Sequence, residues 1–320
     1  MRRYAGLLSS GAPPLRLDWH GFFGRKKFCR YSSLSIKVQW VRNRVRNKVS
    51  TIDTFEYGMN KSEIPSITFS RPLDRAPRAI IVGASSGIGA ALALRLAREG
   101  YTLALLSRRE LKLQKLCEQI HNDTMGQATY FVHDVRSSSD VPDLLLKICA
   151  ELGGLDLFVY NAGIQYPNEP AAYSYDNDLH TFHVNLLGAA AWINLVSERF
   201  QKLRAGHIVA IGSVAGDRGR SGMPAYTASK AGLHTYVEGF RNRLNRHGVA
   251  VTTIKPGQVR TSLLQNAGKE LWPISVEVAA EYIWKAIKHR RMVVYVPSRW
   301  FLIGWMVRLI PSILFRKLNI

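Results

Sequence analysis

The stretch R-A-I-I-V-G-A-S-S-G-I-G, from Arg78 to Gly89, decides the fold of this chain. Its apolar start predicts a buried strand at 79–82, and the apolar repeat that follows predicts a helix over 87–99. The turn between them contains Gly83, Gly87 and Gly89. Glycines at such a turn let the backbone approach a pyrophosphate, which the free N–H groups at a helix start attract. Tight packing between strand and helix is the alternative explanation of the same glycines.

From Arg78 onward, short apolar runs alternate with longer helical periods. This alternation predicts β-α-β units in a single α/β domain, with a doubly wound parallel sheet of about seven strands and helices on both faces. The predicted strands are 79–82, 102–106, 129–133, 155–159, 207–212, 249–255 and 292–296. The predicted helices are 87–99, 109–121, 138–151, 177–203, 225–246 and 276–289.

The positive charge of the chain is concentrated at its two ends. Lys and Arg number 44 against 23 Asp and Glu, a formal net charge of +21. Residues 1–58 hold twelve of these basic residues against three acidic ones, and the segment from Tyr282 onward holds eight basic residues and no acidic one. Because the middle is close to neutral and no recognition motif appears, we expect no nucleic-acid partner. The composition, 47% hydrophobic and 21% charged, is that of a globular protein and not of a disordered chain.

Residues 1–58 allow two interpretations. They are rich in Arg and nearly free of acid, as mitochondrial presequences are, and a presequence would place the protein in mitochondria. Alternatively, Met59 is the true start, and the protein is cytoplasmic and peripheral to the membrane. The prolines within 59–77 indicate a linker to the first strand. The three cysteines lack metal-ligand spacing, so we expect no metal site and a reducing compartment.

The segment 298–320 mixes aromatic and aliphatic residues with Arg308, Arg316 and Lys317. Pro311 and these charges argue against a membrane span, and the chain has no uncharged apolar run of about 18 residues. The mixture favours an amphipathic basic tail at a lipid surface, with apolar atoms in lipid and cations near phosphates. A tail that docks on the core or covers the substrate cleft is the alternative.

Polar residues follow several predicted strands, at the edge where open parallel sheets bind ligands. Arg108 and Arg109 follow the second strand, where an acid would bind the ribose 2′-hydroxyl of NAD(H). A guanidinium there favours a 2′-phosphate, so NADP(H) is preferred although NAD(H) stays open. Asp134 follows the third strand as an acceptor for the adenine amino group, and Asn161-Ala162-Gly163 follows the fourth as a wall for the adenosine ribose. A solvated helix start and ordinary turn residues are the alternatives.

The strongest motif for chemistry is Y-T-A-S-K, from Tyr226 to Lys230. Residues four apart share a helix face, so the ammonium group is expected near the phenol. We expect this charge to lower the pKa of the Tyr226 phenol, as a general acid/base requires. Ser213, at a strand end, can hold the substrate oxygen, and Lys230 can also grip the nicotinamide ribose. A lone Tyr-x-x-x-Lys is usually a surface pair, but the other motifs occur in their proper order.

These motifs together resemble those of the short-chain dehydrogenase/reductase family over about 78–297, which implies a Rossmann-type fold. The resemblance implies a catalytic tetrad of Asn185, Ser213, Tyr226 and Lys230, in which the asparagine holds a water that connects the lysine to solvent. It implies that the cofactor-binding residues are Gly83, Ser85, Ser86, Gly87, Ile88, Gly89, Arg108, Asp134, Val135, Asn161, Ala162, Gly163, Tyr226, Lys230, Pro256, Gly257, Val259 and Thr261.

Two residues depart from the family's pattern. Val82 replaces the usual threonine before Gly83, and Tyr160 replaces the first asparagine of N-N-A-G. Both positions are structural in the family, so we expect weaker local hydrogen bonding and no loss of activity. The family usually associates through the helices predicted here at 177–203 and 225–246, so a homo-oligomer is expected.

The tail, together with V-A-G-D-R-G-R, Y-T-A-S-K-A-G-L and K-P-G-Q-V-R-T, is similar to that of the decaprenylphosphoryl 2-keto-pentose reductase branch. This implies a small-molecule or lipid-linked carbonyl or alcohol substrate and peripheral membrane contact. A presequence would point instead to an organelle, where a polyprenyl substrate is unexpected. The alternative function is a catalytically silent subunit of a mitochondrial assembly, against which the intact tetrad argues.

Overall fold

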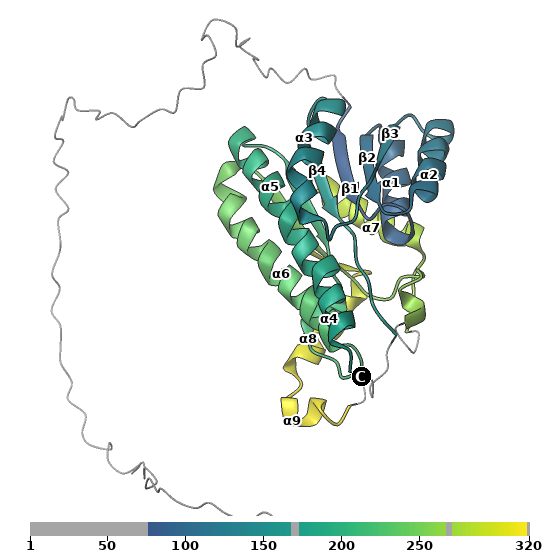
Figure 1. Ribbon diagram of the computed structural model, residues 1–320. Helices are drawn as coiled ribbons and strands as arrows, with labels where there is room; N and C mark the ends of the chain where they lie inside the picture. Colours follow the sequence, from purple (N-terminus) through teal and green to yellow (C-terminus); the bar gives the residue numbers. More distant parts are fainter. Residues whose placement is uncertain (1–75, 168–172, 267–270, 319–320) are drawn as a thin grey trace, which may run out of the picture. The chain divides into compact units, whose positions relative to one another are not determined.

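The computed structural model describes residues 76–167, 173–266 and 271–318 (Figure 1). The predicted leader at 1–58 and nearly all of the linker at 59–77 lie outside these residues. The boundaries predicted for the domains therefore stay predictions.

The core of the protein is a parallel sheet of seven strands in the order β3-β2-β1-β4-β5-β6-β7. The strands are β1 Arg78–Val82, β2 Thr102–Ser107, β3 Gln127–Val132, β4 Leu157–Tyr160, β5 His207–Ile211, β6 Ala250–Pro256 and β7 Val293–Val296. The strand order reverses between β1 and β4, and the crevice beyond the carboxyl ends of such strands is where open sheets bind ligands. The predicted doubly wound Rossmann-type sheet is confirmed.

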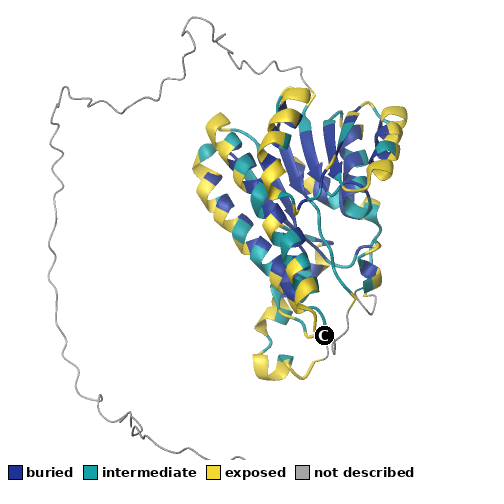
Figure 2. Cartoon of the chain, in the orientation of Figure 1, coloured by how far each residue is buried: buried dark blue, intermediate teal, exposed yellow. Residues whose placement is uncertain are grey.

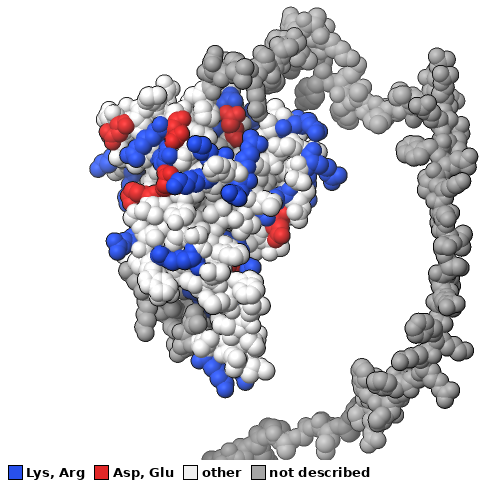
Figure 3. Space-filling view, turned by 180° about the vertical axis from the view of Figure 1, so that it is seen from behind, with Lys and Arg blue, Asp and Glu red and all other residues white. Residues whose placement is uncertain are grey.

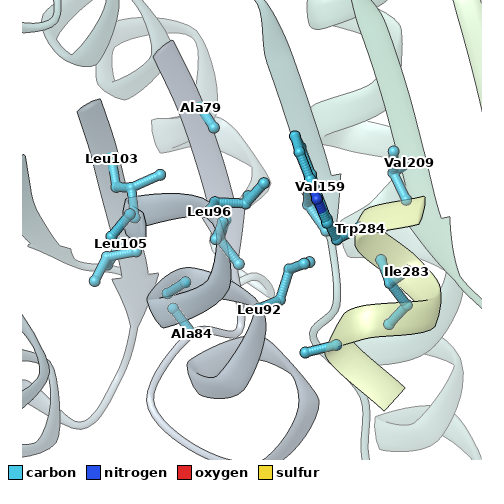
Figure 4. Close-up of a cluster of buried hydrophobic side chains, with 14 of the residues drawn as sticks. Ala79, Ala84, Leu92, Leu96, Leu103, Leu105, Val159, Val209, Ile283 and Trp284 are labelled. Carbon is cyan, nitrogen blue, oxygen red and sulfur yellow. The ribbon is translucent and has the colours of Figure 1, made fainter. Parts of the chain in front are cut away.

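Helices cover both faces of this sheet. On one face lie α1 Gly87–Arg98, α2 Glu110–Asp123 and α7 Val276–Lys288; on the other lie α3 Val141–Glu151, α5 Gly188–Leu203 and α6 Pro224–Leu244. Strand β1 is buried on both sides, since Ala79 and Ile81 join the first core and Ile80 and Val82 the second. This explains its continuous apolar run. Figure 2 shows the buried strands between half-exposed helices, and Figure 4 shows the first core.

The helix predicted at 177–203 is interrupted. It consists of α4 Tyr175–Phe182, a π-helical turn His183–Leu187 and then α5. Helix α4 begins after Ser174, whose side chain accepts a hydrogen bond from the Asn177 N–H. The π turn contains Asn185, and such turns often occur at functional sites. An apolar periodicity does not distinguish a π turn from an α-helical one, so the sequence predicted one unbroken helix.

The C-terminal tail forms α8 Arg299–Leu309 and α9 Ser312–Phe315, which Pro311 separates. Trp300 is buried against the body of the protein, and the Arg308 guanidinium donates to the Asp217 carboxylate at 2.6 Å. The Arg218 guanidinium donates to the Val307 carbonyl at 2.7 Å and lies 4.0 Å from the Phe315 ring centroid. The tail therefore docks on the core, as the alternative interpretation held. No helix in the described ranges is long and apolar enough to cross a membrane.

Candidate active site

A cavity of about 400 Å³ opens at the carboxyl edge of the sheet. Its walls come from the segments that follow β1 to β6 and from α8. Ser213, Tyr226 and Lys230 line it together with every predicted cofactor-binding residue except Gly89. Asn185 does not line it and is fully buried. The structure thus brings almost all of the predicted site residues around one cavity.

The glycine turn packs directly on the segment that follows β4. Gly83 has a φ of +88°, and a Cβ there would lie 2.6 Å from the Ala162 nitrogen. The Asn161 side chain donates to the Gly83 carbonyl at 2.7 Å, where a Cβ on Gly89 would overlap both groups. Close packing, the alternative explanation, therefore accounts for these two glycines. Gly87 and Ile88 at the start of α1 line the cavity, so the helix start is accessible to a pyrophosphate.

Arg108 and Arg109 both follow β2 at the predicted 2′-phosphate position, although the set of cofactor-binding residues predicted from the sequence contained only Arg108. The Arg108 side chain is 54% exposed and lies 3.9 Å from the Asp134 carboxylate. The Arg109 guanidinium instead crosses to the glycine turn, where it donates to the hydroxyl oxygens of Ser85 at 2.7 Å and Ser86 at 2.6 Å. The signal for Arg109 was its place beside Arg108 at the end of β2.

Asp134, the predicted adenine acceptor, already has a cationic partner. The Arg136 guanidinium donates to both of its carboxylate oxygens, to Oδ1 at 3.1 Å and to Oδ2 at 2.6 Å. These bonds from Arg136 lower the pKa of Asp134 to about 2. An adenine amino group would therefore share this carboxylate with Arg136.

The proton-transfer end of the cavity is formed by β5 and α6. Lys230 Nζ lies 5.9 Å from the Tyr226 ring centroid and donates to the Ile211 carbonyl at 3.1 Å. Burial lowers the pKa of Lys230 to about 8. The predicted lowering of the Tyr226 pKa is wrong here, because burial deprives a phenolate of hydration and raises that pKa. The Ser213 hydrogen bond and the Arg220 charge act in the opposite direction.

Asn185 joins the loop after β4 to α6. Its side-chain oxygen accepts from the Ile164 N–H at 2.8 Å, and its amide donates to the Ile164 carbonyl and the Ser229 hydroxyl, each at 3.0 Å. A Cβ on Gly163 would lie 3.3 Å from Lys230 Nζ and 3.4 Å from the Asn185 oxygen, so both groups approach this glycine. The water-holding role of Asn185 stays a prediction.

Tyr160 corrects an expectation from the sequence. Its phenol donates to the Val184 carbonyl in the π turn at 2.6 Å. A Cβ on Gly188 would lie 2.7 Å from this phenol oxygen, so the glycine leaves room for it. The prediction that this departure weakens local hydrogen bonding is therefore wrong, because the longer side chain reaches the turn that holds Asn185.

His234 belongs to the site and was missed from the sequence. Its Nε2 accepts from the Ser213 N–H at 3.4 Å, and its ring fills the space over Gly212 and Gly216. Burial lowers the pKa of His234 to about 3, so the ring is neutral and able to accept. The available signal was its spacing, since Tyr226, Lys230 and His234 recur every four residues along α6.

The tail also contributes to the cavity wall, in agreement with the alternative that it docks on the core or covers the substrate cleft, although Trp300 was not predicted as the residue that does so. Trp300 lines the cavity from α8, and a Cβ on Gly257 would overlap its indole nitrogen. The indole nitrogen is buried and has no hydrogen-bond partner among the described residues. Gly257 therefore lets an aromatic ring of the tail reach the segment after β6.

Comparisons with known proteins identify the family. The family model described as "short chain dehydrogenase" matches residues 77–272. An "Uncharacterized oxidoreductase" of Myxococcus xanthus is 37% identical over 186 residues, 58% of this chain and 73% of that protein. "Uncharacterized oxidoreductase SSP0419" of Staphylococcus saprophyticus is 31% identical over 215 residues, 66% of this chain and 92% of that protein.

Solved structures agree with this assignment. A "Short-chain dehydrogenase from Sphingobium yanoikuyae in complex with NADPH" has a TM-score of 0.65 at 25% identity, covering 74% of this chain and 97% of that one. An alcohol dehydrogenase from Thermococcus sibiricus complexed with 5-hydroxy-NADP shares the fold, with a TM-score of 0.63 at 24% identity over 69% of this chain and 95% of that one. The fold, the motifs and the family model lead to one conclusion: this chain belongs to the short-chain dehydrogenase/reductase family.

Proposed function

We propose that the protein is an NADP(H)-dependent oxidoreductase that interconverts a carbonyl and a secondary alcohol. One observation carries this proposal: Tyr226, Ser213 and Lys230 meet at one end of a cavity whose other end is a glycine cradle with two arginines. The relatives named above are described as oxidoreductases, which does not favour a silent subunit.

The proposed chemistry runs through the side chains at the end of β5 and on α6. When bound, NADPH supplies the hydride. Tyr226 gives its phenolic proton to the carbonyl oxygen, which the Ser213 hydroxyl orients. Lys230 would hold the nicotinamide ribose of a bound cofactor, and its ammonium group can return a proton to the tyrosine. Because burial raises the pKa of Tyr226, the phenol is protonated near neutral pH and can donate the proton that carbonyl reduction requires.

The proposed cofactor follows from charge at the end of β2. Arg108 and Arg109 supply two guanidinium groups there, and β2 ends in Ser107 and not in the acidic residue that would bind a ribose 2′-hydroxyl. The Sphingobium and Thermococcus proteins, whose structures contain NADPH and an NADP analogue, support this choice.

A cofactor-oxidation screen tests the function. The purified protein is given NADPH or NADH and ketones of increasing chain length, and Tyr226→Phe serves as the matched variant. We expect ketone-dependent NADPH oxidation that falls by at least about a hundredfold in the variant, because one general acid contributes about that much. NADPH affinity should be unchanged. Equal turnover by the two proteins would contradict the role of Tyr226.

We also propose that the tail brings the cavity to a lipid surface and that the substrate is apolar or lipid-linked. Figure 2 shows α8 and α9 largely exposed, and the exposed apolar residues there are Phe301, Leu302, Trp305, Met306, Leu309, Ile313 and Leu314. Arg308, expected to face lipid phosphates, is bound to Asp217, so Arg316 and Lys317 supply the exposed charge. In Figure 3, basic and acidic residues are dispersed over the upper part of the visible face, and the lower part of this face is mostly uncharged.

Vesicle co-sedimentation tests the membrane contact. Trp305→Gln combined with Leu309→Gln removes exposed apolar area and leaves the buried Trp300 and the Arg308 ion pair in place. We expect the parent to sediment with vesicles, more strongly when these contain anionic lipid, and the variant to stay in solution. Leu111→Gln, an exposed leucine on α2, is the control. If the parent ignores both kinds of vesicle, the membrane proposal fails.

A further inference from the structure

One cation that lines the cavity has no hydrogen-bond or ion-pair partner among the residues that the structure describes. Arg220 lies in the loop between the turn Val214–Asp217 and α6, and it lines the cavity with Met223 and Tyr226. Within the described ranges, its guanidinium makes no hydrogen bond or ion pair. Burial lowers the pKa of Arg220, and the charges of Tyr226 and Asp217 offset this effect only in part.

The charge of the nearest acidic residue is already balanced. The Asp217 side chain is 2% exposed and binds Lys255 at 2.7 Å and Arg308 at 2.6 Å. The Tyr295 phenol donates a third bond to the same carboxylate at 2.8 Å. Two cations therefore already surround this single carboxylate, and the positive charge of Arg220 remains in excess at the substrate end.

The neighbouring arginine of the same loop shows the contrast. Arg218 donates to the tail carbonyls of Val307 and Ile310 and stacks on the Phe315 ring. It holds the loop against the tail, whereas Arg220 lines the cavity. The glycine turn, Arg108 and Arg109 are the groups proposed above to bind the phosphates of the cofactor, so Arg220 is not needed for that role.

We propose that Arg220 is a substrate-binding residue and that the substrate carries an anionic group close to its reacting carbonyl. This inference rests on the proposed function. A half-buried guanidinium without a partner gains charge-assisted, bidentate hydrogen bonds when a carboxylate or phosphate binds. Arg220 lies close enough to Tyr226 for its charge to lower the pKa of that phenol. Both residues line the same cavity, so one bound molecule could place an anion on Arg220 and its carbonyl at Tyr226.

A second role has to be distinguished from anion binding. Arg220 also lowers the pKa of Tyr226, so its removal could impair proton transfer with every ketone. That role would reduce kcat for charged and neutral substrates alike and would shift the pH profile of kcat. Loss of anion binding would instead raise KM, and only for the charged substrates.

Matched pairs of ketones test the proposal with the full chain and saturating NADPH. The pairs are short and long 4-oxo acids against their methyl esters, and dihydroxyacetone phosphate against dihydroxyacetone. We expect kcat/KM at least about tenfold higher for the anionic member of one pair, which corresponds to about 1.4 kcal/mol. Arg220→Gln should abolish this preference through KM, and Arg220→Lys should retain part of it. A preference for the long 4-oxo acid over the short one would identify a lipid source of the anion.

Arg260→Gln is the matched control, because this exposed arginine lies near the cavity but does not line it. The control should leave the preference unchanged. Equal kcat/KM within every pair would overturn the inference, as would an Arg220→Gln defect that is the same for acids and esters. If no ketone is turned over, the proposed function fails. Calorimetry of the NADP⁺ complex with the oxo acids then decides the inference: binding lost in Arg220→Gln supports it, and unchanged binding overturns it.

Discussion

The Tyr160 phenol donates a 2.6 Å hydrogen bond to the Val184 carbonyl and so ties the end of β4 to the π turn that holds Asn185. The phenol is fully buried, and burial raises its pKa, so it remains a donor. Asn185 in turn binds Ile164, four residues beyond Tyr160. The end of β4 and the π turn are therefore joined twice, once through each side chain.

Tyr160→Phe should destabilise the protein and reduce its turnover. The substitution leaves the buried Val184 carbonyl without this donor, which costs about 1–3 kcal/mol of unfolding free energy. Turnover should fall because Asn185 loses part of its support. Denaturant unfolding and kcat measure the two effects. The control is Tyr130→Phe, whose phenol bonds Gln114 and Glu110 near the surface and whose loss should cost less. Equal losses in the two variants would contradict a special role for Tyr160.

The strands were predictable because burial requires apolar residues, and the location of the polar site residues was predictable because they follow these strands. Ile80 and Ile81 face opposite cores, so β1 had to be apolar throughout, and the polar residues after each strand had to meet at one edge. The π turn and the docking of Trp300 were not predictable. Both depend on contacts between distant segments, such as Trp300 with Gly257, and local periodicity contains no information on these contacts.

Arg109→Asp should alter cofactor choice at least as much as Arg108→Asp. Arg109 binds both serine hydroxyls of the glycine turn, while Arg108 is half exposed and only weakly paired. An aspartate at either position would repel a 2′-phosphate and accept from a 2′-hydroxyl instead, so NADPH should weaken relative to NADH. Dissociation constants for both cofactors in the parent and the two variants measure this. A parent that already prefers NADH would refute the assignment of these arginines.

Stability should fall as the pH falls from about 6.5 toward 4, because two histidines are buried in neutral form. Burial lowers the pKa of His234 to about 3 and that of His207 to about 4, from an ordinary value of 6.5. In this window the unfolded chain binds protons that the native imidazoles do not, so each histidine costs about 1.4 kcal/mol of unfolding free energy per pH unit. Denaturant unfolding across this range should show a smaller slope in His207→Gln. An unchanged slope would show that His207 is protonated in the native state or does not contribute.

Gly257→Ala should impair catalysis by moving the tail, and shortening Trp300 should reverse much of the damage. The added Cβ would overlap the indole nitrogen of Trp300, so either the ring or the segment after β6 must shift. That segment begins with Gly257 and lines the cavity, so a shift should weaken NADPH binding and lower kcat/KM. Trp300→Ala alone should affect NADPH binding less, because it opens space without displacing the backbone.

In the double variant the overlap is gone, and NADPH affinity should return toward that of Trp300→Ala. The double-mutant cycle thus measures the contact between the two residues. Additive effects on NADPH affinity and kcat/KM would show that the tail ring does not act on the segment after β6.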